Sequence, residues 1–178
     1  MPAERKVILY IAISMDGYIA KKNDDLEFLS IIQEEGEDYG YGAFIETVDT
    51  VIMGRRTYDW IMKKVAEFPH KNKQTYIITR KSRPDIGNIR FYTRNLRNLI
   101  RELKNETGKN IFIDGGAQIV NELLKENLIE EYIISIIPVL LGSGIRLFHE
   151  GYKEQNLKLI KAEYFAKGLV QLHYIAEN

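Results

Sequence analysis

The sequence predicts an α/β protein with a mixed, mostly parallel β-sheet and an antiparallel hairpin at its C-terminal edge. Short apolar runs such as residues 7–13 and 111–113 have the composition of strands that are buried on both faces. Helical patterns separate most of these runs, which is typical of strands that pair in parallel. Near the end of the chain, residues 157–165 and 169–176 flank a turn that contains Gly168, which is the pattern of a hairpin.

The first half of the chain alternates strand and helix patterns after the strand at 7–13. Apolar residues recur with helical spacing at 26–32, and Asp24 or Asp25 is a suitable N-cap for that helix. The remaining elements predicted for this half are a short helix at 43–48, a strand at 50–53 that ends at Gly54, a helix at 56–64, and strands at 74–79 and 88–92.

The second half is arranged around two adjacent glycines, Gly115 and Gly116. An amphipathic helix at 95–106 precedes the strand at 111–113, and apolar residues with helical spacing follow the glycines. A strand at 131–139 comes before the hairpin. A helix that starts directly after glycines can bind a phosphate, because its unpaired N–H groups are positive and no side chain blocks access. The alternative is a tight turn between two packed elements.

Composition narrows the class of protein. The chain has 178 residues, 45% of them hydrophobic, which predicts one domain spanning residues 1–178 with a sizeable core. Lys plus Arg and Asp plus Glu are equal at 25, which argues against a nucleic-acid or membrane-surface binder. The absence of cysteine excludes disulfides, thiol catalysis and thiolate metal sites, and we expect no metal. Without a recognisable signal peptide or membrane-crossing run, a soluble cytoplasmic protein is the expectation.

Three predicted strand ends carry similar chemistry, at residues 54–57, 79–81 and 114–116. Their sequences are Gly-Arg-Arg-Thr, Thr-Arg-Lys and Asp-Gly-Gly. Ligands of such sheets bind beyond the carboxyl ends of the strands, and arginine suits phosphate because its planar fork donates two parallel hydrogen bonds. Together these ends predict a site for a phosphorylated cofactor, although the basic run at Arg80, taken alone, is also typical of a solvated loop.

The same segments resemble the dihydrofolate reductase superfamily. The motifs are VIMGRRT at 51–57, IITR at 77–80 and IFIDGGA at 111–117, while SMDGYIA at 14–20 and PVLLGSGIRLF at 138–148 are similar to its riboflavin-biosynthesis branch. That branch is the reductase domain of the bifunctional deaminase-reductase. The resemblance runs in order over nearly the whole chain. It implies a dihydrofolate reductase-like three-layer α/β/α fold, NADPH as cofactor and a homodimer. A zinc deaminase signature is absent, so we expect a stand-alone reductase domain.

The resemblance also implies roles for individual residues along NADPH. The residues beside the nicotinamide are Ala12 and Ile19. Those on the pyrophosphate and adenosine side are Gly54, Arg55, Thr57, Gly115 and Gly116, and in this family the peptide between the two glycines is cis. Those at the 2′-phosphate are Thr79 and Arg80, with Lys81 next to them. Those that complete the cofactor wall are Gln118, Ile119 and Val120.

Three carboxylates are candidates for the substrate side. Asp16 lies next to the expected nicotinamide pocket and either acts on the substrate or only ties its turn. Asp25 or Glu27 could replace the carboxylate that holds the pterin in dihydrofolate reductases and could supply a proton.

Aromatic residues and histidines offer weaker signals. Tyr39, Tyr41 and Phe44 could stack on a planar substrate or could pack over the core. The three histidines, at positions 70, 149 and 173, lack metal-ligand spacing, and we expect them at the surface or at sheet edges.

The sequence therefore predicts an NADPH-dependent reductase of a pyrimidine or pterin compound. The best named candidate is 5-amino-6-(5-phosphoribosylamino)uracil, and the alternatives are dihydrofolate reduction and a non-catalytic nucleotide-binding module. A homodimer is also favoured by the apolar run at 132–141 followed by Ile145, Leu147 and Phe148, because this surface needs a cover. The alternative is that this arm folds back on its own core.

Overall fold

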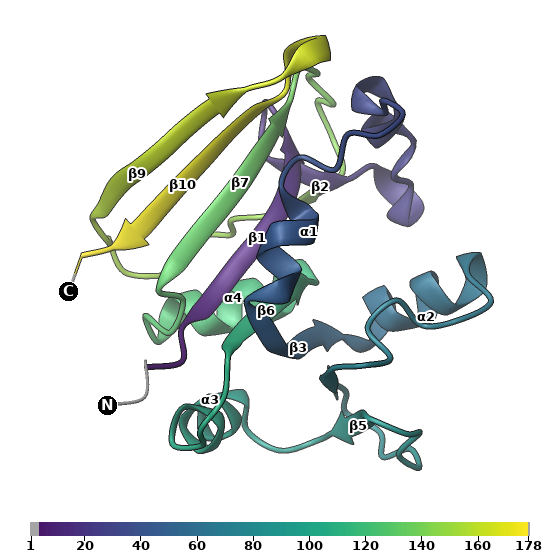
Figure 1. Cartoon of the computed structure of the whole chain (residues 1–178), viewed down its shortest axis with the longest axis vertical. Coiled ribbons are helices and arrows are strands. Elements are labelled where there is room, and N and C mark those ends of the chain that lie inside the picture. Colours follow the sequence, from purple (N-terminus) through teal and green to yellow (C-terminus); the bar gives the residue numbers. More distant parts are fainter. Residues whose placement is uncertain (1–3, 178) are drawn as a thin grey trace.

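The structure is a computed structural model that describes residues 4–177. The strands of its main sheet are β1 (Val7–Ser14), β3 (Val48–Gly54), β4 (Gln74–Ile78), β5 (Ile89–Tyr92), β6 (Asn110–Gly115), β7 (Glu131–Ile137), β9 (Leu157–Tyr164) and β10 (Val170–Ala176). Their order is β5-β4-β3-β6-β1-β7-β10-β9 (Figure 1). Pairing is parallel from β5 to β7 and antiparallel between β7 and β10 and between β10 and β9. The predicted fold class is confirmed. A small second sheet pairs β2 (Tyr18–Ala20) with β8 (Ile145–Arg146).

The helices lie close to their predicted positions, with one change of type. The α-helices are α1 (Tyr41–Glu46), α2 (Arg55–Lys64), α3 (Leu96–Lys104) and α4 (Ala117–Lys125), and the 3₁₀ helices are η1 (Lys22–Asp24), η2 (Glu27–Ile32) and η3 (Ala166–Gly168). The predicted N-caps at Asp24 and Asp25 are wrong, because η2 begins after Leu26 without a side-chain cap. Asp25 instead accepts a hydrogen bond from the amide of Glu27 (2.7 Å).

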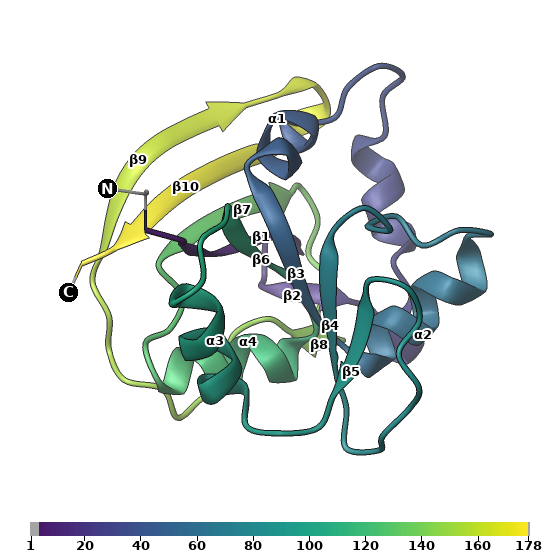
Figure 2. The same cartoon turned by 60° about the horizontal axis from the view of Figure 1, so that its bottom comes forward.

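Both faces of the parallel part of the sheet are covered, as its continuous apolar strands require. Side chains alternate between the faces along each strand. Leu9 of β1 and Ile111 of β6 pack with α3 and α4, whereas Ile8 and Phe112 pack with α1 and α2 on the opposite face. Figure 2 shows α3 and α4 together on one side of the sheet and α1 on the other. This three-layer arrangement leaves the strand ends as the open edge.

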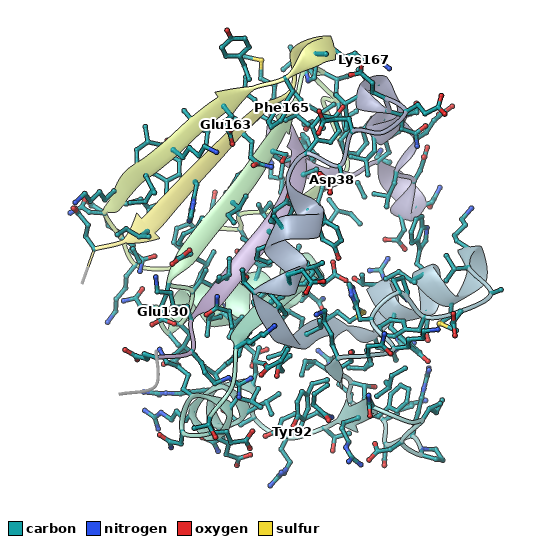
Figure 3. The ribbon with its side chains drawn as sticks, in the orientation of Figure 1. Asp38, Tyr92, Glu130, Glu163, Phe165 and Lys167 are labelled. Carbon is teal, nitrogen blue, oxygen red and sulfur yellow. The ribbon has the colours of Figure 1, made fainter. Side chains whose placement is uncertain are left out.

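The C-terminal hairpin extends beyond these helices. Figure 3 labels Glu163 on β9 and Lys167 at the hairpin tip, which reaches the loop of Asp38 before α1. There the ammonium group of Lys167 donates to the carbonyl of Gln33. β9 is an edge strand with large apolar side chains exposed, and Tyr164 is 89% exposed.

The apolar arm predicted as a dimer surface, residues 132–148, is mostly covered by its own chain. Tyr132, Ile137 and Leu147 are buried, and only Phe148 (38% exposed) and Leu140 remain at the surface among its large side chains. The arm therefore folds back on its own core, because β7 is an inner strand between β1 and β10. The exposed apolar surface lies on the hairpin instead.

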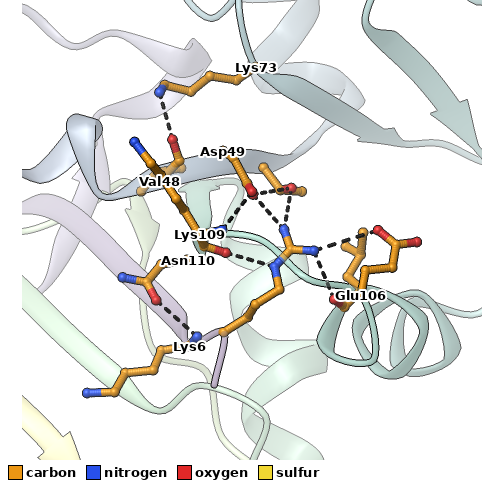
Figure 4. A network of polar contacts seen from close by, with 10 residues as sticks. Lys6, Val48, Asp49, Lys73, Glu106, Lys109 and Asn110 are labelled. Atoms are coloured by element: carbon orange, nitrogen blue, oxygen red, sulfur yellow. Dashed lines mark hydrogen bonds and ion pairs between the residues drawn. The ribbon is translucent and has the colours of Figure 1, made fainter. Parts of the chain in front are cut away.

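Arg5 lies just before β1 and joins three elements at the end of the sheet where the parallel strands begin. Its buried guanidinium donates to the carbonyl oxygens of Leu103 (2.9 Å) and Lys109 (2.7 Å). It also donates to the Asp49 carboxylate (2.6 Å) and the Thr50 hydroxyl (2.7 Å). Figure 4 shows this network around Asp49 and Lys109. Arg5 thus ties the start of β1 to α3, β3 and β6.

We expect Arg5→Met to lower the free energy of unfolding by about 2–4 kcal/mol, because it leaves buried acceptors without a donor. The matched control is Arg90→Met. Arg90 forms an exposed ion pair with Asp85 (2.8 Å), and its loss should cost less than about 1 kcal/mol. Urea denaturation measures both, and equal losses would contradict the role assigned to Arg5.

Candidate functional site

The candidate site is a cleft beyond the carboxyl ends of β1, β3, β4 and β6. Its volume is about 1180 Å³. Pockets for a single small ligand usually have roughly 300–1,000 Å³, so this cleft has room for a cofactor and a substrate together. The three strand ends that carry glycines and cations in the sequence all line it.

The residues implied for cofactor contact come together in this cleft, with one exception. Those that line it are Ala12, Ile19, Gly54, Arg55, Thr57, Thr79, Arg80, Lys81, Gly115, Gly116, Gln118 and Ile119. Val120 does not line the cleft, because its side chain is buried in the core between α4 and the sheet. Its neighbour Ile119 faces the cleft from the same helix.

Two helices begin at glycines on the wall of this cleft. Gly54 precedes α2 and Gly116 precedes α4, and neither helix has a side-chain cap. A Cβ atom at Gly116 would lie 3.6 Å from the backbone of Gly54, so the two helix starts are neighbours. The amide groups in their first turns are unpaired within the helices and carry partial positive charge.

The peptide between Gly115 and Gly116 is trans, because no cis peptide occurs within residues 4–177. The cis peptide implied by the resemblance is therefore absent. Both glycines have positive φ angles, 125° and 92°, which side chains disfavour. The chain turns from β6 into α4 through these two angles.

Cations on the cleft wall differ in their pairing. Arg55 and Arg83 both bind the carboxylate of Asp59, each at 2.9 Å. Burial acts to raise the pKa of Asp59, but Arg83 and Arg55 outweigh it and hold the pKa below its usual value. Arg56 of α2 pairs with Asp24 of η1 at 3.0 Å.

Other cleft cations carry no ion pair within the described chain. They are Arg80, Lys81 and Arg94, which follow β4 and β5. Three unneutralised positive charges therefore remain at this end of the cleft.

At the other end of the cleft, an aspartate on the wall contacts a buried histidine behind it. Asp114, the residue before Gly115, lines the cleft, and its Oδ2 lies 3.0 Å from Nε2 of His70. His70 is only 6% exposed, so our expectation of a surface histidine is wrong. The loop that carries His70 has no sequence pattern that predicts a buried histidine. The position of Asp114 at a strand end, in contrast, could be predicted from the sequence.

The sequence left open whether the aromatic residues before and in α1 stack on a substrate or pack over the core, and they differ in position. Tyr41 lines the cleft, and burial together with the negative charge of Asp114 raises the pKa of its phenol. Phe44 is buried against Phe112 (5.0 Å between ring centres) and belongs to the core. Tyr39 packs on Phe165 away from the cleft.

The three predicted carboxylates lie outside the cleft lining. Asp16 accepts hydrogen bonds from the Ser14 hydroxyl (2.6 Å) and from the amides of Leu141 (3.0 Å) and Gly142 (2.7 Å). These bonds, led by that of Ser14, lower the pKa of Asp16 to about 2. This geometry favours the turn-tying role of Asp16.

Asp25 and Glu27 serve the loop before η2. Asp25 binds the amide of Glu27, and the exposed carboxylate of Glu27 lies 3.2 Å from the ammonium group of Lys21. Neither side chain reaches the cleft.

A cleft at the carboxyl ends of a mostly parallel sheet, with glycines at two helix starts, is typical of α/β proteins that bind nucleotides. Residues 5–171 match the model of the RibD C-terminal domain, and the chain belongs to that family. The resemblance seen in the sequence is confirmed, and the chain is a riboflavin-biosynthesis reductase-like domain.

Individual relatives agree with this family. The uncharacterized protein YwjB of Bacillus subtilis (strain 168) is 45% identical over 175 residues, which cover 97% of this chain and 98% of YwjB. The crystal structure of a putative riboflavin biosynthesis protein from Shewanella sp. PV-4 has a TM-score of 0.88 at 31% identity and covers 97% of this chain and 99% of that one. A dihydrofolate reductase from Enterococcus faecalis, in complex with NADP(H), matches over 100% of both chains with a TM-score of 0.70. At 12% identity it shows a shared fold alone.

Residues 4–177 contain no helix that is long and apolar enough to cross a membrane. The same residues contain no group of three or more histidine, aspartate or glutamate side chains that could hold a metal ion.

We expect Asp16→Asn to lower the melting temperature at pH 7, because an amide nitrogen cannot accept the bonds that the carboxylate accepts. The pKa of Asp16 lies below that of an unfolded aspartate, about 3.9. Its stabilisation is therefore present above pH 4 and is lost as the pH falls towards 2. Thermal melts of both proteins should converge over that interval. The control is Glu35→Gln, whose exposed carboxylate has no hydrogen bond within residues 4–177, and a gap that stays constant from pH 7 to pH 2 would contradict the assignment.

Proposed function

We propose that this protein is an NADPH-dependent reductase of a pyrimidine- or pterin-type compound. One observation carries the proposal: the uncapped starts of α2 and α4 and three unpaired cations lie along one cleft that is large enough for two ligands. A dinucleotide phosphate needs this combination, because its pyrophosphate and its 2′-phosphate lie at separate points along the molecule.

The pyrophosphate would bind where α2 and α4 begin. Gly54 and Gly116 leave the amide groups of both first turns accessible, and helix N-termini attract phosphate. Thr57, whose hydroxyl lies 3.5 Å from the Cβ position of Gly116, would add a donor.

The 2′-phosphate would bind at the ends of β4 and β5. Arg80 and Lys81 follow β4, and Arg94 follows β5. Within residues 4–177 these three residues form no ion pair that a phosphate would have to displace, unlike Arg55 and Arg83. Family membership and the fold shared with an NADP(H)-bound dihydrofolate reductase support the same cofactor.

When bound, NADPH supplies a hydride to a C=N or C=O carbon of the substrate. Ala12 and Ile19 would hold the nicotinamide between apolar surfaces, which orients it and excludes water. Asp114 is a carboxylate of the cleft lining that would accept a hydrogen bond from the substrate, so the proton would come from water. The substrate expected from the sequence, 5-amino-6-(5-phosphoribosylamino)uracil, is one member of this class.

We expect Arg80→Ala to weaken NADPH binding by about 1.5–3 kcal/mol, the size of a hydrogen bond to a charged group, and to leave NADH binding nearly unchanged. Fluorescence titration with both cofactors measures this. Arg101→Ala is the matched control, because Arg101 is an exposed arginine on α3 that does not line the cleft. Equal losses for NADPH and NADH would refute the 2′-phosphate site. Oxidation of NADPH in the presence of any pyrimidine or pterin would exclude a module without catalysis.

We also propose a homodimer that pairs the β9–β10 hairpins of two copies. β9 is an eight-residue edge strand with both faces exposed, and Leu159 (50%) and Ile160 (49%) point to opposite faces. A free edge of this length with apolar side chains is prone to pair with another strand. A two-fold contact with a second copy would satisfy the backbone groups and cover the side chains.

Light scattering at micromolar concentration should give twice the chain mass of 20.7 kDa. Leu159→Glu should halve the measured mass, because a carboxylate buried at the contact between the two copies would destabilise the dimer. Phe148→Glu should leave the mass doubled, since Phe148 lies outside the hairpin. A mass of one chain for the unaltered protein rejects the dimer, and halving by Phe148→Glu alone rejects this surface.

A further inference from the structure

The lysine and arginine side chains of the cleft all lie on one side, which is defined by the order of the strands in the sheet. These cations all come from the start of α2, which follows β3, or from the segments after β4 and β5; they are Arg55, Arg56, Arg80, Lys81, Arg83 and Arg94. In the sheet order β5-β4-β3-β6-β1, these segments belong to one side. The side formed by β6 and β1 contributes no lysine or arginine from the described residues.

The β6–β1 side is largely aromatic and apolar. The residues that line it include Tyr10, Ala12, Leu26, Leu29, Tyr41 and Asp114. Asp24, which is paired with Arg56, and the exposed residues Glu122 and His149 also line the cleft. Tyr10 and Tyr41 contact each other edge to face, with 5.6 Å between ring centres. Such walls suit a flat ring, and Asp114 is the carboxylate at the end of β6 beside them.

The carboxylate of Asp114 has one oxygen engaged and one open. Oδ2 is bound by Nε2 of His70, and Oδ1 has no hydrogen-bond partner in the part of the chain that the structure describes. The side chain is 23% exposed and lies on the cleft wall. Because an ionised carboxylate only accepts hydrogen bonds, Nε2 of His70 must carry the proton between them.

His70 can hold this geometry because its ring is fixed. It lies edge to face against Phe68 (5.5 Å between ring centres) and against Phe112 (6.0 Å). The histidine is therefore a positioning residue that acts through Asp114. It leaves Oδ1 free as an acceptor on a side chain that lines the cleft.

We propose that Asp114, held by His70, binds an N–H edge of the substrate, and that the substrate is a flat heterocycle without a phosphate. This inference rests on the proposed function and narrows its substrate class. The starts of α2 and α4 are assigned to the cofactor's pyrophosphate, and the cations of the opposite side to its 2′-phosphate. A further phosphate, carried by the substrate on the β6–β1 side, would face Asp114 with no lysine or arginine to balance it. An amino group or ring N–H instead satisfies Oδ1.

The test uses the two halves of a phosphoribosylated pyrimidine as separate probes. Calorimetry measures 5,6-diaminouracil, the ring, and ribose 5-phosphate, the arm, binding to the full chain with saturating NADPH. The ring should bind and the arm should neither bind nor compete. Asp114→Asn should weaken the ring at least tenfold and leave NADPH affinity unchanged. Glu122→Gln is the control, because the exposed carboxylate of Glu122 also lines the cleft but has no ion pair or hydrogen bond within residues 4–177.

The role of His70 is tested by removing its hydrogen-bond donor and then restoring a donor at the same position. His70→Leu should weaken the ring several-fold, and His70→Gln, which keeps a donor, should restore part of the affinity at unchanged NADPH binding. Competition by ribose 5-phosphate, or ring affinity indifferent to Asp114→Asn, would overturn the inference. If NADPH itself does not bind, the proposed function fails, and the ring titration with Asp114→Asn repeated without NADPH still decides the role of Asp114.

Discussion

The close approach of β6 to β3 at their carboxyl ends is the constraint on which the site depends. Gly116 lies against Gly54 with space for no more than a small side chain, and its φ angle of 92° disfavours one. The turn through Gly115 and Gly116 lets α4 start beside the start of α2, so their unpaired amides face the same space. The parallel strand order then places the cations after β4 and β5 on one flank and Asp114 on the other.

Local sequence patterns were sufficient for the sheet and for the strand ends that line the cleft. The parallel strands are continuous apolar runs that end at glycine or at charged residues, and both signals are local. Residues such as Gly54, Arg80 and Gly116 stand directly at those ends, so their convergence follows from the topology once the strands are parallel. Val120 differs because one residue of rotation around α4 separates the cleft from the core.

The surroundings of Asp114 and Asp16 could not be predicted in the same way, because they depend on contacts between distant segments. His70 meets Asp114 across 44 positions of sequence from a loop without periodicity. Asp16 has the residue type of a catalytic acid, but the amides of Leu141 and Gly142 occupy its oxygens. The sequence of the arm at 132–141 does not show which segment covers it. In the fold, β10 pairs with β7 and covers the arm.

The ion pair between Asp24 and Arg56 is a contact at the cleft wall that depends on salt concentration. It joins η1 to α2 where both elements line the cleft, and both side chains are exposed. An exposed pair contributes at most about 1 kcal/mol, which thermal motion overcomes readily. Because salt screens exposed charges, the contact between η1 and α2 should weaken as the ionic strength of the surroundings rises.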